Sequence, residues 1–499
     1  MKLRIIIFLS YLLFLSTSSI AQKAAPSPYG VLPSFRQLKW HEMETYAFVH
    51  FTTNTFTGKE WGYGDEDPAV FNPTAFDPDQ IVLSLKSAGM KGLILTCKHH
   101  DGFCMWPTKT TEHNISKSPW RNGKGDMVKE FSAACRRNGL KFGVYLSPWD
   151  RNSKYYGSPD YVNIYRAQYT ELLTQYGPVF ETWHDGANGG DGYYGGAKEM
   201  RKIDAANYYG WDSTWKMERK LQPDANIMSD IGWDIRWVGT EAGYSGDPCW
   251  HTYTPHGLSE GVKPGPGLVK SEEGLNGHRD GKYWIPAEVD FSIRPGWFFH
   301  EQENSKVKTG KQLLDHYFAS VGHGASMLLN VPPDKRGRIH SIDSASLAEF
   351  GHLINQLYAT DHAKDAVAMA SNVRGSYKIF GADKVLDKDR YSYWATDDTV
   401  RSAELTLQLK TKKLFNVIRL RGNIKLGQRI DDWAVDTWQG GAWKEYAKGT
   451  AIGACRLVRG KAVYADKVRI RITKAAASIC LSEVGIFSEA NLQGMAESR

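Results

Sequence analysis

The sequence predicts an α/β fold, a (β/α)8-like barrel of the TIM type, followed by a C-terminal all-β sandwich. Short apolar runs alternate with amphipathic segments from residue 46 onward, and about eight such runs occur before residue 360. Repeated strand and helix over this spacing implies right-handed crossovers in a parallel sheet, and eight strands favour a closed barrel. After residue 360 the helical periodicity stops and short alternating runs follow, which predicts antiparallel strands.

The N-terminal residues have the composition of a secretory signal peptide. A basic start at Lys2 and Arg4 precedes an apolar segment over residues 5–15, and Ser19-Ile20-Ala21 provides a small-residue exit. The apolar segment is too short to span a bilayer as a permanent helix. We therefore predict a signal peptide over residues 1–21, cleaved after Ala21. The mature protein is expected to have no membrane span and to be periplasmic or secreted.

The barrel is expected over residues 22–360. Its helices are predicted at residues 77–90, 127–137, 161–176, 311–321 and around 347–357. Glycine-rich stretches over residues 186–196 and 243–281 are expected to form loops over the active face. Its strands are predicted at residues 46–51, 92–97, 141–146, 179–183, 225–228, 236–239, 285–291 and 327–331.

The second domain is expected over residues 361–499. Its strands are predicted at residues 403–409, 414–421, 434–437, 467–472 and 483–487. The chain has six irregularly spaced cysteines, which do not form the framework of a small disulfide-rich fold. Cys455 and Cys480 lie in the same late segment and are candidates for a pair. The other four fit buried small residues at least as well as bridges: Cys97, Cys104, Cys135 and Cys249.

The composition excludes some classes of partner. A length of 499 residues with 41% hydrophobic residues allows two or three domains with large cores. The net charge of +7 is small and spread along the chain, so nucleic acid is not an expected partner. The 17 Trp and 25 Tyr residues include rings that could stack on sugar faces, although most of them must fill the cores.

Polar residues follow the predicted barrel strands with regularity. Because a barrel places the carboxyl ends of all its strands around one mouth, a ring of such residues indicates a functional site. The ring is expected to contain His50, His99, His100, Asp101, Ser147, Trp149, Asp185, Asp230, Glu241, Glu288, Asp290 and Asn330.

Two carboxylates on either side of a glycosidic bond are sufficient for its hydrolysis. Asp185 ends the run Val179-Phe180-Glu181-Thr182-Trp183-His184, where rigid backbone would position a short nucleophile. An Asp before Gly is more often a turn residue, and the ring of polar residues is what favours a catalytic role. The proton donor is better placed on a loop or a later strand, and Glu241 suits that role. The competing acids are Glu60, Asp230, Glu288 and Asp290.

His99 and His100, with His50, raise the question of a metal. Cys97 and Cys104 lie nearby, but the spacing matches no common zinc pattern, and adjacent strand residues point to opposite faces. We therefore expect these imidazoles to act as neutral donors to sugar hydroxyls. A purely structural role, or a metal-dependent hydrolase centred on His99 and His100, remains an alternative. Another is a secreted glycan-binding protein whose barrel has lost catalysis.

Several motifs together resemble one known family. They are Phe48-Val49-His50-Phe51, Glu60-Trp61, Lys98-His99-His100-Asp101-Gly102-Phe103, Gly143-Val144-Tyr145, Trp183-His184-Asp185-Gly186 and Leu328-Leu329-Asn330-Val331-Pro332-Pro333. In this order they resemble the family 29 glycoside hydrolases, the retaining α-L-fucosidases, over residues 35–360. The resemblance implies a (β/α)8-like barrel, an aspartate nucleophile, no metal or other cofactor, and fucosylated oligosaccharides or glycoconjugates as partners.

The resemblance also implies roles for individual residues. Asp185 matches the nucleophile, although His184 stands where many members carry an aromatic residue. The stretch over residues 236–243 resembles the subgroup that prefers branched α-1,3/1,4-linked fucose, as in Lewis-type glycans, over simple aryl fucosides. In that subgroup Glu241 would be the acid/base. Residues that match the fucosyl pocket are His50, Glu60, Trp61, His99, His100, Tyr145, Trp183, Arg294 and Trp297.

The chemistry of fucose agrees with this assignment. Fucose is a 6-deoxy sugar, so its pocket must offer donors for three hydroxyls and an apolar wall for a methyl group, which His beside Trp and Tyr supply. In a retaining enzyme the two carboxyls should lie about 5–5.5 Å apart. The segment after residue 360 resembles discoidin-type carbohydrate-binding sandwiches. Such domains hold glycan, bind a structural calcium or buttress a neighbouring domain, and we expect the last.

Overall fold

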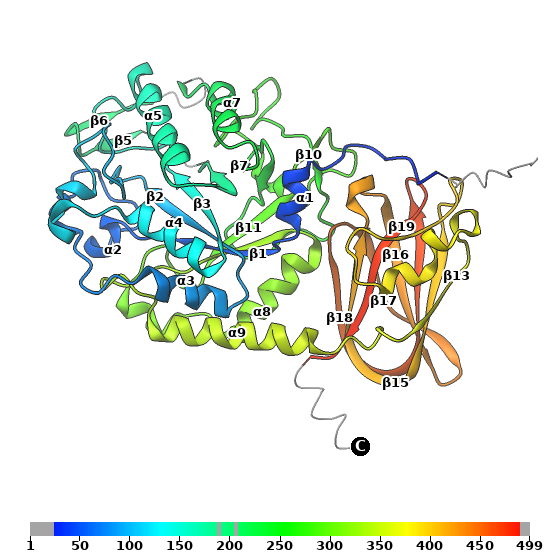
Figure 1. The fold of residues 1–499 in the computed structure, drawn as a ribbon. Coiled ribbons are helices and arrows are strands. Elements are labelled where there is room, and N and C mark those ends of the chain that lie inside the picture. The colour runs from blue at the N-terminus through cyan, green and yellow to red at the C-terminus, as the bar shows by residue number, and fades with distance from the viewer. Residues whose placement is uncertain (1–23, 187–190, 204–207, 490–499) are drawn as a thin grey trace, which may run out of the picture.

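The computed structural model describes residues 24–186, 191–203 and 208–489, which form a barrel domain beside an antiparallel domain (Figure 1). The predicted signal peptide over residues 1–21 lies outside the described residues. In the part of the chain that is described, no helix has both the length and the apolar character needed to cross a bilayer.

Eight parallel strands close into a barrel, which confirms the predicted fold class. Each strand pairs with the next, and the last returns to the first through the register Thr45 to Met327. Most of these strands are buried on both faces, which explains why they appear in the sequence as continuous apolar runs. They are β1 (Thr45–Val49), β2 (Gly92–Lys98), β3 (Lys141–Leu146), β4 (Glu181–Trp183), β7 (Asn226–Ser229), β8 (Ile235–Trp237), β11 (Ala287–Ser292) and β12 (Ser326–Asn330).

Helices surround the barrel, and local sequence signals set their ends. The Asp77 and Asp126 carboxylates cap two of them by accepting backbone N–H groups, and Gly139 ends the second with φ of 75°. The helices are α1 (Phe35–His41), α2 (Thr53–Thr57), α3 (Pro78–Ser87), α4 (Met127–Asn138), α5 (Pro159–Gln175), α7 (Trp211–Leu221), α8 (Gly310–Ala319) and α9 (Ser341–Ala359). The sequence analysis did not predict α1, α2 and α7.

Two connections of the barrel carry short antiparallel ribbons. One pairs β5 (Gly192–Tyr194) with β6 (Glu199–Arg201), and the other pairs β9 (Thr252–Tyr253) with β10 (Tyr283–Trp284). Residues 254–282 join β9 to β10, and we call this segment the covering loop. It belongs to the glycine-rich stretch that the sequence predicts as a loop over the active face.

The C-terminal domain is all-β, as predicted, but its seven strands form one connected antiparallel sheet instead of two separate sheets. The runs predicted at residues 403–409 and 414–421 belong to a single strand, whose pairing with β18 shifts register between Gln408 and Lys413. Such bulges bend long strands. The strands are β13 (Val367–Ala370), β14 (Trp394–Ala395), β15 (Ala403–Gly422), β16 (Ile430–Gln439), β17 (Ala442–Ile452), β18 (Arg456–Ala475) and β19 (Cys480–Phe487).

All six cysteines are buried free thiols, so the candidate bridge between Cys455 and Cys480 does not form. Cys455 packs into the same apolar cluster as the barrel strands, whereas Cys480 packs with Phe380 and Ala395 in the C-terminal domain. Proximity in sequence did not indicate proximity in space here, because the two residues lie on either side of the long strand β18.

Charged side chains join the two domains. Glu44, just before β1, pairs with Arg421 of β15 and with Arg390 at 3.1 Å. Two bidentate pairs, Arg456 with Asp247 and Arg279 with Asp431, link the C-terminal domain to the connection between β8 and β11. Arg421 and Arg390 hold the pKa of Glu44 well below its ordinary value, against the opposing effect of burial. The interface therefore contains matched charges, of which Glu44 and Arg421 are the most shielded from water, beside apolar residues such as Leu457 and Phe487 that pack into the barrel core cluster.

We predict that Arg421→Met destabilises the protein by about 3–5 kcal/mol, because it leaves Glu44 buried beside fewer cations. Thermal unfolding of the full chain measures the change. The matched control is Lys39→Met, because the pair of Lys39 and Glu42 is exposed, and exposed pairs contribute about 0–1 kcal/mol. Equal midpoints for the two variants would contradict the prediction.

Candidate active site

A cavity of about 390 Å³ opens at the carboxyl ends of the barrel strands. Its volume lies within the range of about 300–1,000 Å³ that is usual for small-molecule sites. Among the residues that the structure describes, no lysine or arginine lines it. The wall is formed by Phe48, His50, Trp61, His99, His100, Tyr145, Trp183, His184, Asp185, Gly186, Met228, Asp230, Trp237, Glu241, Leu258, Gly267, Val269, Ser271, Asp290 and Trp297.

Asp185 follows β4 and faces the cavity with a side chain that is 21% exposed. The Tyr145 hydroxyl donates a hydrogen bond of 2.8 Å to Asp185 Oδ2, and Nε2 of His100 lies 3.6 Å from the same oxygen. Behind it, the buried His184 is anchored by Glu218 at 3.0 Å and by the Tyr165 hydroxyl at 3.2 Å. The carboxyl is therefore held in place by neutral groups.

Glu241 lies at the rim of the same cavity, beyond β8. Gly239 makes the turn before it with φ of 95°, and its backbone passes so close to Ser271 of the covering loop that a Cβ would clash there. The Trp297 indole N–H lies 3.3 Å from Glu241 Oε2. Partial burial raises the pKa of Glu241, the Trp297 contact opposes this shift, and the charge of Glu60 adds to it.

Three imidazoles form the opposite side of the cavity. His50 Nδ1 bonds Asn330 Oδ1 at 2.8 Å, His100 Nδ1 bonds Ser147 Oγ at 2.7 Å, and the His99 and His100 rings are tilted by 38° with centroids 4.0 Å apart. Burial lowers the pKa of His50 to about 4 and that of His100 to about 3. Burial, with the neighbouring imidazoles, also lowers the pKa of His99 well below its ordinary value. All three rings are therefore neutral near pH 7.

Aromatic rings supply the apolar part of the wall. Phe48 packs edge-on against Trp183 with ring centroids 5.0 Å apart, and Trp297 lies 6.3 Å from Phe48. The Trp183 indole N–H donates to Glu288 Oε1 at 2.7 Å. Glu288 is one of the acids that competed for a catalytic role, and it lies beneath this ring and off the cavity wall.

The structure does not place every predicted pocket residue on the wall. Arg294 is not among the cavity-lining residues, and its buried guanidinium pairs with Asp343 of α9 at 2.8 Å. Glu60 also lies off the wall, where it accepts the backbone N–H of Trp297 at 2.9 Å and bonds His300 at 2.9 Å. Trp61 lies on the rim and is 53% exposed.

The wall also contains two acids that the sequence analysis placed in the polar ring and weighed as competitors for the catalytic role. Asp230 and Asp290 are buried and face the cavity. Four residues of the covering loop complete the wall, and their sequence carries no periodic signal that could have identified them. They are Leu258, Gly267, Val269 and Ser271.

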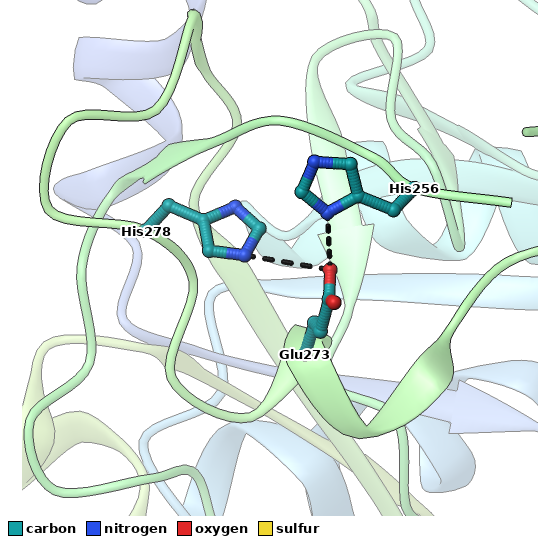
Figure 2. A group of neighbouring side chains, drawn as sticks. All are labelled: His256, Glu273 and His278. Atoms are coloured by element: carbon teal, nitrogen blue, oxygen red, sulfur yellow. Dashed lines mark hydrogen bonds and ion pairs between the residues drawn. The ribbon is translucent and has the colours of Figure 1, made fainter. Parts of the chain in front are cut away.

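Among the described residues, one group has the spacing of a metal site, and it does not involve His99 or His100. His256, Glu273 and His278 of the covering loop point toward one another (Figure 2). The Thr254 backbone N–H donates to His278 Nδ1 at 3.1 Å, which leaves the proton of a neutral ring on Nε2, facing Glu273 at 3.4 Å. This arrangement is a hydrogen-bonded cluster that ties the two ends of the loop together.

A closed parallel barrel with two carboxyls on one sugar-sized cavity defines a glycoside hydrolase. Residues 28–357 match the family described as α-L-fucosidase, and the chain belongs to this family, glycoside hydrolase family 29. Because the chain belongs to this family, it is a fucosidase. This assignment replaces the two alternatives, a metal-dependent hydrolase and a non-catalytic binding protein.

Relatives match the chain over most of its length. Alpha-L-fucosidase 1 of Arabidopsis thaliana is 39% identical over 481 residues, which cover 95% of this chain and 91% of the relative. A solved structure of a Ruminococcus gnavus family 29 fucosidase in complex with fucose is 32% identical, with a TM-score of 0.84. The match covers 94% of this chain and 97% of the solved chain. The solved structure of a family 29 member from an unknown rumen bacterium is 39% identical, with a TM-score of 0.81. The match covers 93% of this chain and 78% of the solved chain.

We predict that the His50 and His100 rings remain neutral from pH 8 down to pH 5, because their folded pKa values, about 4 and about 3, lie below this range. Proton–carbon NMR of protein labelled at histidine should show two ring resonances that do not move, each assigned by its loss in His50→Gln or His100→Gln. Free histidine in the same tube titrates near its pKa of about 6.5. If either ring resonance shifted over the same pH range as free histidine, the prediction that the ring stays neutral would be contradicted.

Proposed function

We propose that the chain is a retaining exo-α-L-fucosidase that releases L-fucose from branched α-1,3/1,4-linked, Lewis-type glycans by double displacement. The observation that carries the proposal is that Asp185 and Glu241 line one cavity opposite a set of neutral donors. Two carboxyls in one cavity supply the nucleophile and the acid/base that this mechanism requires.

In the first step Asp185 attacks the anomeric carbon and Glu241 protonates the departing oxygen. Asp185 suits attack because it is short, follows a rigid strand and is oriented by the Tyr145 hydroxyl at 2.8 Å. Its carboxyl faces the cavity, where a negative charge can stabilise the positive charge that develops at the anomeric carbon.

In the second step Glu241, now ionised, removes a proton from the water that releases fucose. Its raised pKa favours the protonated form needed first, and the Trp297 indole at 3.3 Å stabilises the ionised form needed second. Activity should therefore persist to higher pH than an unshifted glutamate allows, and it should decline as pH rises through the pKa of Glu241.

The remaining wall fits a 6-deoxy sugar. His50, His99 and His100 offer uncharged ring nitrogens to three hydroxyls, while Trp183 and Trp297 provide apolar surface for the methyl group. The fucose complex of the Ruminococcus gnavus relative supports fucose as the sugar that is bound. The similarity of residues 236–243 to the Lewis-specific subgroup supports the linkage. The predicted signal peptide supports export to the periplasm or beyond.

We predict that Asp185→Ala and Glu241→Ala give opposite stereochemical products when azide is added to α-L-fucosyl fluoride. Without its nucleophile the enzyme should form β-L-fucosyl azide, because azide attacks from the side that Asp185 occupied. Without its acid/base it should form α-L-fucosyl azide from the covalent intermediate. Each variant should lose on the order of 10³-fold or more in turnover of a glycan substrate without azide.

The configuration is read by proton NMR of the product, with the wild-type enzyme as the control for retained hydrolysis. Inverted product from the wild type, or the same azide from both variants, would remove the assigned roles.

We also predict a linkage preference. A panel of Lewis a, Lewis x, an α-1,2-linked and an α-1,6-linked fucosyl oligosaccharide, assayed by mass spectrometry, should show at least about tenfold higher kcat/KM for the two Lewis trisaccharides. Equal rates across the panel would refute the preference while leaving the fucosidase assignment intact.

A further inference from the structure

The cavity contains two more acids than double displacement uses. Asp230 follows β7 and is 7% exposed, and Asp290 lies in β11 and is 2% exposed. Both line the cavity together with Asp185 and Glu241. Burying a carboxyl costs free energy unless its hydrogen bonds are made, so each of these acids needs a structural explanation.

The contacts of Asp290 explain its position. The Trp237 indole N–H donates to Asp290 Oδ1 at 2.7 Å, and Trp237 itself lines the cavity. Burial raises the pKa of Asp290 well above its ordinary value, with the nearby Glu241 charge adding to the shift and the Trp237 contact opposing it. Asp290 therefore holds an aromatic ring of the wall in place.

The contacts of Asp230 leave one oxygen unexplained. The Gly267 backbone N–H of the covering loop donates to Oδ2 at 2.8 Å, whereas Oδ1 is buried and has no hydrogen-bond partner among the described residues. Burial raises the pKa of Asp230 to about 7, the Gly267 contact opposes this, and the charge of Asp185 adds to it. Below that pH the group can both donate and accept a hydrogen bond.

The position of Asp230 points to the leaving group. Its strand, β7, lies between β4, which leads to Asp185, and β8, which leads to Glu241. A Cβ placed on Gly186, directly after Asp185, would lie 2.6 Å from Asp230 Oδ2, so the acid touches the backbone beside the nucleophile. In double displacement the leaving group departs on the side of the acid/base, and β7 is the neighbour of the strand that leads to Glu241.

The groups that are proposed to bind fucose lie on the other side of the ring of strands. His50 follows β1, and His99 and His100 follow β2, on the far side of the ring from β7. The wall beside Asp230 is built instead from the covering loop, through Gly267 and its neighbour Val269. Asp230, which carries the unpartnered oxygen, therefore lines the part of the cavity that the fucosyl donors do not serve.

We propose that Asp230 binds a hydroxyl of the leaving-group sugar and so makes turnover depend on a glycan leaving group. This inference rests on the proposed fucosidase function. Asp230 is a specificity-determining residue in this proposal, and the covering loop positions it through the Gly267 N–H.

The test compares Asp230→Ala and Asp230→Asn with the wild type on a Lewis trisaccharide and on α-L-fucosyl fluoride, whose leaving group carries no hydroxyl. For Asp230→Ala we expect kcat/KM on the trisaccharide to fall about tenfold to hundredfold, and to fall at least about tenfold less on the fluoride. Asp230→Asn, which keeps a donor and an acceptor, should retain more trisaccharide activity than Asp230→Ala.

Glu272→Gln is the matched control, because it removes an exposed acid from the same loop outside the cavity wall. This variant should have the same kcat/KM as the wild type on both substrates. Equal losses on the two substrates for Asp230→Ala, or no loss on either, overturn the proposal. A wild type that hydrolyses neither substrate overturns the proposed function itself, which is a different result.

A binding measurement keeps the test decisive if Asp230→Ala does not fold. In an Asp185→Ala background, calorimetry should show that Asp230→Asn lowers the affinity for the trisaccharide more than it lowers the affinity for L-fucose. Equal weakening of the two ligands, or none, also overturns the proposal.

Discussion

Closing eight parallel strands into one ring is the constraint on which the rest of this structure depends. It brings every carboxyl end to a single rim, although the residues there are spread from His50 to Asn330 in the sequence. The ring also sorts them by chemistry. On the cavity wall the acids lie in or after the neighbouring strands β4, β7, β8 and β11, whereas His50, His99, His100 and Tyr145 lie in or after β1, β2 and β3, and His184 is the imidazole on the acid side.

This sorting determines the electrostatics of the cavity. Among the described residues, no lysine or arginine lines the wall, and burial raises the pKa of Glu241, Asp230 and Asp290 against the opposing effect of their hydrogen-bond donors. Burial thus favours the uncharged form both of these acids and of the imidazoles. A sugar is a neutral ligand that offers hydroxyls, and such a cavity can bind it by hydrogen bonds without burying an ion pair.

The sequence predicted the barrel well, because buried parallel strands are continuous apolar runs and polar residues stop them at the rim. For that reason it could name Asp185, Glu241 and the three histidines before any coordinates. It could not foresee the ion pair of Arg294, which also follows a strand, because its partner Asp343 lies 49 residues away in α9. It could not find Val269 or Gly267 either, since a loop has no period that links its residues to a wall.

The covering loop leaves the barrel between β8 and β11 and returns without contributing a strand to the ring. Its two ends are held together by the cluster of His256, Glu273 and His278, so the loop carries its own fastening outside the ring. A change in this excursion would alter one side of the cavity while leaving the eight strands, and the carboxyl that follows β4, in place.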